Sequence, residues 1–142
     1  MRNAPLGRRL GAIVYDGLLV FALQLLGTVP FVALEGGDVV EPGTLAHQLT
    51  VLAIAWLFFC GFWTRAGKTL GMQSWRLQLE MPDGRRPGLG TATIRFFAAI
   101  VSWLPFGLGY WWQIWDRDGL AWHDRMSGTR LRFYPRETSP TN

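Results

Sequence analysis

The strongest constraint on the fold is the length of the uncharged apolar runs. Residues 10–34 contain one charged side chain, Asp16, and residues 45–63 and 96–115 contain none. A helix needs about 20 predominantly apolar residues to cross the hydrocarbon core of a bilayer. The sequence therefore predicts an all-α membrane protein with two full transmembrane helices, at 10–34 and 45–63, and a third hydrophobic segment at 96–115.

The composition agrees with a membrane protein. Charged residues make up only 17% of the chain, whereas soluble domains carry nearer a quarter. Eight of the 142 residues are tryptophan, which favours the membrane–water interface because its ring is apolar and its N–H is polar. The length suits one domain over residues 1–142, and we expect a disordered polar tail at about 136–142.

The third segment is broken in its middle by Pro105, Gly107 and Gly109. Proline removes a helical hydrogen bond and glycine eases a turn, so the segment either crosses the membrane or turns back as a re-entrant hairpin. Basic residues precede the first segment and fill residues 64–95, but residues 35–44 have none. The positive-inside rule places the N-terminus and residues 64–95 in the cytoplasm, at the cell membrane.

A re-entrant third segment would also keep the five arginines of the tail in the cytoplasm. We therefore favour the hairpin over a full span, with a cytoplasmic C-terminus. Within the cytoplasmic loop, residues 75–81 alternate between apolar and polar, and Pro82-Asp83-Gly84 is typical of a turn. This pattern predicts a short β-hairpin at the membrane surface, and the tail after residue 115 predicts a short amphipathic helix.

Two charged residues of the first helix are the first candidates for a site. Arg9 and Asp16 are seven residues apart, so they share a helix face but are separated by about 10 Å along the axis. That separation is too great for a direct pair, and an unpaired carboxylate in the membrane costs at least about 2.5 kcal/mol. We expect Asp124 of the returning tail to pair with Arg9. The candidate partners for Asp16 are three basic residues, Arg65, Lys68 and Arg95.

Other classes of site lack the residues they need. The single cysteine, Cys60, and two histidines that the predicted topology places on opposite faces offer no metal site, and we expect no cofactor. A P-loop is improbable because five residues separate Gly61 from Gly67 and a membrane helix precedes them. No catalytic set stands out, so we expect no enzyme. The net charge of +4 is explained by topology, and we expect no nucleic-acid partner.

Three motifs together resemble the RDD family of small membrane proteins. The first is Arg9 to Asp16, read as R-x-x-A-x-x-x-D; the second is Ala66-Gly67-Lys68-Thr69-Leu70-Gly71 followed by the alternating segment; the third is Trp122 to Thr129, similar to h-D-x-x-[AS]-G-T. The resemblance implies that Arg9, Asp16 and Asp124 are the trio for which the family is named. It also implies a helical membrane domain, with transport, including cation/proton antiport, suggested for some members.

The chain departs modestly from the family pattern. Arg65 stands where a small or polar residue is common, and the chain is near the minimal length for the family. Two functions remain open. In the first, Asp16 is an intramembrane proton or cation site of a transport-related protein. In the second, Arg9, Asp16 and Asp124 form a stabilising charge network in a non-catalytic structural or partner-binding membrane module.

The expected partners follow from the membrane assignment. The lipid bilayer is the first, and a homo-oligomer or another membrane protein is the second, because three segments make a thin wall for an ion path. Small residues of the third segment would allow close contact between helices. They are Ala98, Ala99, Ser102, Gly107 and Gly109.

Overall fold

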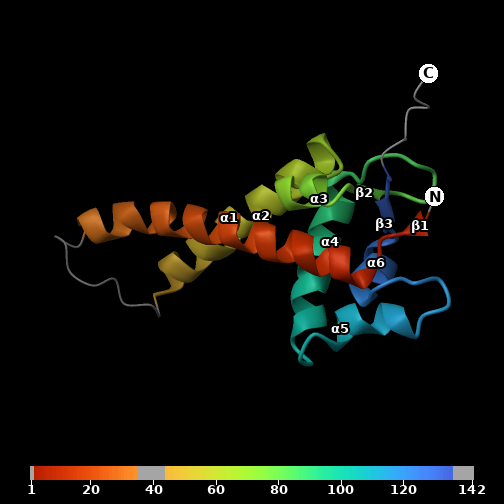
Figure 1. The fold of residues 1–142 in the computed structure, drawn as a ribbon. Helices are drawn as coiled ribbons and strands as arrows, with labels where there is room; N and C mark the ends of the chain where they lie inside the picture. The colour runs from red at the N-terminus through yellow and green to blue at the C-terminus, as the bar shows by residue number, and fades with distance from the viewer. Residues whose placement is uncertain (1, 35–43, 136–142) are drawn as a thin grey trace, which may run out of the picture.

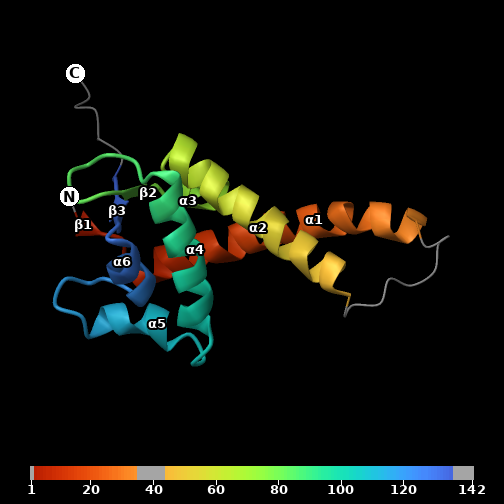
Figure 2. The same cartoon turned by 180° about the vertical axis from the view of Figure 1, so that it is seen from behind.

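A computed structural model describes residues 2–34 and 44–135, and the chain folds into two long helices joined to a compact end of short elements (Figures 1 and 2). The elements, in chain order, are β1 (Arg2–Asn3), α1 (Leu6–Leu34), α2 (Leu45–Arg65), α3 (Leu70–Ser74), β2 (Leu77–Glu80), α4 (Leu89–Trp103), α5 (Leu108–Trp111), a 3-10 turn η1 (Trp112–Ile114), α6 (Trp122–Ser127) and β3 (Arg130–Phe133). We call the part formed by β1, the first turns of α1, the end of α2 and everything from α3 to β3 the compact end.

The two predicted membrane helices are confirmed. Both α1 and α2 are long and apolar enough to cross a membrane, and most of their large apolar side chains are exposed on the protein, as lipid contact requires. The helices approach closely at Gly27, where an added Cβ would lie 2.3 Å from Ile54 Cδ1. The Gln24 side chain also donates a hydrogen bond to the Val51 carbonyl at 2.8 Å. The pair leaves the compact end together (Figure 1).

The break in the third segment is also confirmed, but the segment starts earlier than predicted. Helix α4 begins at Leu89 instead of residue 96. Arg95, which the prediction left in the preceding loop, lies buried inside the helix. The axes of α4 and the α5–η1 segment differ by 108°. Phe106 and Gly107, both with positive φ, form the corner. Whether this bent segment crosses the bilayer stays a prediction.

The predicted β-hairpin after residue 75 is wrong. Strand β2 pairs with β3 from the far end of the chain, and β1 pairs with the other edge of β3, giving the antiparallel order β1-β3-β2. The residues that follow the turn at Gly84 lead to Pro87 and α4 without alternation, so they offer no second strand. Residues 130–133 do alternate, and Leu131 is buried with Leu79 in the core.

Two further predictions concern the tail. The short helix expected after residue 115 is present as α6, but its polar residues His123, Asp124 and Ser127 are buried within the compact end. The reason is that α6 packs against α4, which covers its polar side. The predicted disordered tail at about 136–142 lies outside the described residues.

Candidate functional site

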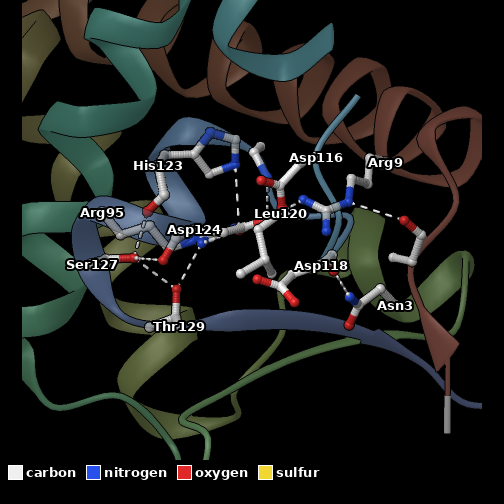
Figure 3. Close-up of polar contacts among 12 residues, drawn as sticks. Asn3, Arg9, Arg95, Asp116, Asp118, Leu120, His123, Asp124, Ser127 and Thr129 are labelled. Carbon is white, nitrogen blue, oxygen red and sulfur yellow. Dashed lines mark hydrogen bonds and ion pairs between the residues drawn. The ribbon is translucent and has the colours of Figure 1, made fainter. Parts of the chain in front are cut away.

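A buried carboxylate, Asp124, joins two arginines from different helices. Arg9 Nη1 of α1 donates to Asp124 Oδ2 at 2.5 Å, and Arg95 Nη1 of α4 donates to Asp124 Oδ1 at 2.6 Å. All three side chains are at most 3% exposed. Figure 3 shows the two guanidinium groups reaching Asp124 from opposite sides. The expected contact between Arg9 and Asp124 is therefore present, and Arg95, expected near Asp16, belongs to this charge cluster instead.

Local sequence places Asp124 for this role. It is the third residue of α6, so its Oδ2 also accepts the backbone N–H of Ala121 at 3.1 Å and caps the helix start. Gly128 ends the helix with a φ of 64°, a conformation that favours glycine, and turns the chain toward Thr129. The Thr129 hydroxyl then accepts a hydrogen bond from Arg95 Nη1 at 2.7 Å. Thr129 was not predicted as a site residue, although the closing Ser-Gly-Thr motif contains it.

The charges of the cluster explain its protonation. Burial by itself would raise the pKa of Asp124, but the guanidinium groups of Arg95 and Arg9 outweigh burial and hold that pKa well below its usual range. Asp124 is therefore ionised at neutral pH. Two cations against one anion leave the cluster of Arg9, Arg95 and Asp124 with one net positive charge.

His123 lies beside the cluster and is neutral. Burial, together with the charge of Arg95, lowers the pKa of His123 from 6.5 to about 3. The ring packs against that of Tyr110, with 4.6 Å between centroids, and Nε2 lies 3.6 Å from Asp124 Oδ1. A histidine with these surroundings does not serve as a cation near neutral pH.

The lowered pKa of His123 predicts a loss of stability in mild acid. In the unfolded chain the ring takes up a proton below about pH 6.5, but in the folded chain it does so only near pH 3. The stabilisation is therefore complete above pH 6.5 and is lost as the pH falls. Between about pH 7.5 and pH 5 we expect a loss of about 2 kcal/mol. Unfolding in detergent micelles should show it for the wild type and not for His123→Phe; parallel pH slopes would contradict the assignment.

Asp16 lies in a different environment from the predicted one. Its Oδ2 accepts a hydrogen bond from the Thr69 hydroxyl, and its Oδ1 accepts the Gly71 backbone N–H at 2.8 Å. The side chain is 2% exposed and makes no ion pair within the described residues. The predicted basic partners were wrong. They are Arg65, exposed at the end of α2, Lys68, half-buried, and Arg95, bound to Asp124.

The turn between α2 and α3 explains why Asp16 meets neutral donors. Gly67, with a φ of 70°, reverses the chain so that the start of α3 faces α1. The Thr69 hydroxyl also accepts the Met72 N–H at 3.2 Å and so caps α3. Gly71 permits the close approach, since an added Cβ would lie 2.4 Å from the Ala12 carbonyl oxygen. The residues at 66–71 thus supply N–H and O–H donors where we expected lysine or arginine.

A cavity of about 200 Å³ lies within the compact end, and its lining comes mainly from α1, α2 and α4, with single residues from α3, α5, α6 and β3. Its walls are mainly apolar, but Arg9, Asp16, Arg95 and His123 all border it. The cavity therefore touches both carboxylate sites, directly at Asp16 and through the two arginines at Asp124. Within residues 2–34 and 44–135, no group of three or more His, Cys, Asp or Glu side chains is arranged to hold a metal ion.

One comparison with known proteins gives a match. The model of the RDD family matches residues 3–128, which include both carboxylates and both arginines of the site. No curated protein and no solved structure matches the chain.

Proposed function

Since the chain belongs to the RDD family and has two helices able to span a membrane, we propose that it is a non-catalytic membrane module in which the charge cluster holds the C-terminal segment on the first membrane helix. The observation that carries the proposal is that one carboxylate, Asp124, binds Arg9 and Arg95 together. These residues come from three elements that are far apart in the sequence. Such an arrangement is suited to fixing helices relative to one another.

The experiment that tests this role is a double-mutant cycle. Arg9→Met and Asp124→Asn are each introduced alone and together, and the free energy of unfolding is measured in detergent micelles. Because Arg9 and Asp124 are in direct contact at 2.5 Å, we expect a coupling energy above about 1 kcal/mol. Losses that simply add would rule out a role for this contact in holding the tail.

The orientation we propose places both termini in the cytoplasm of a cell. The pairing of β1 with β3 supports it, because residues 2–3 and 132–133 lie side by side. The contact between Arg95 and Asp124 supports it too, since Arg95 lies in α4 before the corner at Phe106 and Gly107, and Asp124 lies in α6 after it. A continuous helix of 20 residues would put its ends about 30 Å apart. The bent segment is therefore proposed to be re-entrant.

This orientation predicts the result of reporter fusions in bacterial cells. A fluorescent protein that folds only in the cytoplasm should be bright when fused after residue 142, and alkaline phosphatase fused there should be inactive. Insertion between α1 and α2 should give the reverse pattern and serves as the control. Active phosphatase at the C-terminus would contradict the re-entrant hairpin.

Transport is the second candidate, and one observation favours it. Asp16 borders the cavity, and its carboxylate has only neutral partners, the Thr69 hydroxyl and the Gly71 N–H, within the described residues. A buried carboxylate without a cationic partner is stabilised by a proton or a bound cation. Because three hydrophobic segments make a thin wall, a transporter would be a homo-oligomer or would act with another membrane protein.

Everted membrane vesicles test the transport candidate. They should show cation-driven pH changes that Asp16→Asn removes, and a wild type without such changes would exclude this candidate.

A further inference from the structure

Three buried N–H groups of residues that border the cavity have no acceptor in the described part of the chain, and His123 Nδ1, on a fourth bordering residue, has no hydrogen-bond partner there either. The three N–H groups are Arg9 Nη2, Arg95 Nε and Trp63 Nε1, and all three residues border the cavity. Arg95 also lies over the Trp63 ring, with its Cζ 5.4 Å from the ring centroid, so these two donors are close together. Buried polar groups almost always have a hydrogen-bond partner. Three unpaired donors beside one cavity therefore indicate a missing acceptor.

The charge of the same region indicates that the acceptor is anionic. Arg9 and Arg95 share the single carboxylate of Asp124, which leaves one buried positive charge. The other acid that borders the cavity, Asp16, is about 10 Å away from Arg9 along α1, and its two oxygens accept hydrogen bonds from the Thr69 hydroxyl and the Gly71 N–H. A water molecule could accept the N–H groups, but it would not balance the charge.

The rest of the cavity is suited to hydrocarbon. Arg9 and Arg95 are 2% and 3% exposed, whereas Ile100 and Trp103, also on the cavity wall, are 41% and 52% exposed. The cationic part of the lining is therefore buried, and we call it the floor; the more exposed apolar part, at Ile100 and Trp103 of the third hydrophobic segment, we call the mouth. An apolar cavity of about 150 Å³ is enough to bind benzene, so a cavity of about 200 Å³ can hold part of an alkyl chain.

We propose that this cavity binds a single-chain amphiphile with a carboxylate head, the chemistry of a fatty acid. The head lies at the floor beside Arg9, Arg95 and Trp63. The alkyl chain lies against Ile100 and Trp103 and leaves through the mouth toward the bilayer. This binding site is independent of the role proposed for the charge cluster, because it concerns the donors that Asp124 leaves unpaired.

Quenching of tryptophan fluorescence tests the site, since Trp63 and Trp103 both border the cavity. The protein is reconstituted in phosphatidylcholine vesicles at alkaline pH, and 9,10-dibromostearate is added. The bromines lie midway along the chain, on the part proposed to contact Trp103, so we expect saturable quenching that is largely lost in Trp103→Phe. The methyl ester of the same acid lacks the charge, and we expect it to bind at least tenfold more weakly to the wild type. Equal quenching by acid and ester would overturn the proposal.

Two variants on α4 distinguish binding of the probe in the cavity from its contact with the lipid-facing surface of the protein. Ala99 borders the cavity, so Ala99→Phe should fill it and weaken the saturable quenching at least tenfold. Ile94 is 53% exposed on the same helix and does not border the cavity, so Ile94→Phe should leave the quenching unchanged. Unaltered binding in folded Ala99→Phe would contradict the proposal, as would displacement of the probe by acetate, which has no chain. The comparison of acid with ester needs no variant and holds even if Ala99→Phe fails to fold.

Discussion

Asp124→Asn is expected to lower the free energy of unfolding by about 3–5 kcal/mol, because it removes the only carboxylate that Arg9 and Arg95 contact within the described residues. Two guanidinium groups would then remain buried without a countercharge. An asparagine side chain has one oxygen in place of two, so it could accept from one arginine, but its amide nitrogen would face the other donor. Chemical unfolding in mixed detergent micelles would measure the loss.

Asp118→Asn is the matched control for this variant. Asp118 lies six residues away in the same segment, its side chain is 64% exposed, and its nearest cation, Arg125, is 3.4 Å distant. Exposed pairs of this kind contribute little, so we expect a change within about 0.5 kcal/mol. If both substitutions cost the same, the charge cluster would not be what holds the tail in place. The two variants should also differ in the solvent exposure of α6. Only Asp124→Asn should increase it, because only Asp124 holds this helix against α1 and α4.

The membrane helices and the broken segment could be predicted because their signals are local. Length and lack of charge identify α1 and α2, and Pro105 with its neighbouring glycines identifies the corner between α4 and α5. The start of α4 was placed too late for a related reason. In the sequence, the charge of Arg95 suggests that it ends a polar loop. In the structure its buried partner, Asp124, allows the arginine to lie inside a helix.

The partner of β2 could not be predicted from local pattern alone. Leu77 pairs with Phe133, more than fifty residues further along the chain, whereas a turn at Gly84 directly after the strand suggests a hairpin. Four residues, 130–133, are too short a run to identify a strand, although they alternate. The pairing depends on α6 and the charge cluster, which bring the tail back to the start of the chain.

The contact of Arg9 with Asp124 was predicted, but the surroundings of Asp16 were not. An acid in a membrane helix suggests a basic partner, since charge pairing is the commonest way to bury it. The Thr69 hydroxyl and the Gly71 N–H satisfy Asp16 instead. Backbone N–H groups are present in every sequence, and only the turn at Gly67 directs these toward α1.

Asp16 variants are the second case in which we expect a large effect. Asp16→Leu would leave the Gly71 N–H and the Thr69 hydroxyl without their buried acceptor. Each unsatisfied donor costs about 1–3 kcal/mol, so we expect a loss of about 2–4 kcal/mol after the threonine hydroxyl reorients. Asp16→Asn keeps one carbonyl oxygen for Gly71 and offers its amide to Thr69, so about 1 kcal/mol is expected. Unfolding in micelles again measures both.

A glycine pair tests whether the contact between α1 and α3, and not the charge of Asp16 alone, stabilises the compact end. Gly71→Ala places a Cβ 2.4 Å from the Ala12 carbonyl oxygen and 2.8 Å from Asp16 Cγ, so the helices must separate at a cost of about 1–3 kcal/mol. Gly17→Ala, on the open side of α1, meets nothing within 4 Å and should be neutral or slightly stabilising. Equal effects of the two glycine variants would show that α3 does not rest on α1.

The same Asp16→Asn variant separates the two roles of the carboxylate. If it loses about 1 kcal/mol of stability and also loses a cation-driven pH change, Asp16 serves transport in addition to holding α3. If it loses only the stability, the role of Asp16 is to hold α3.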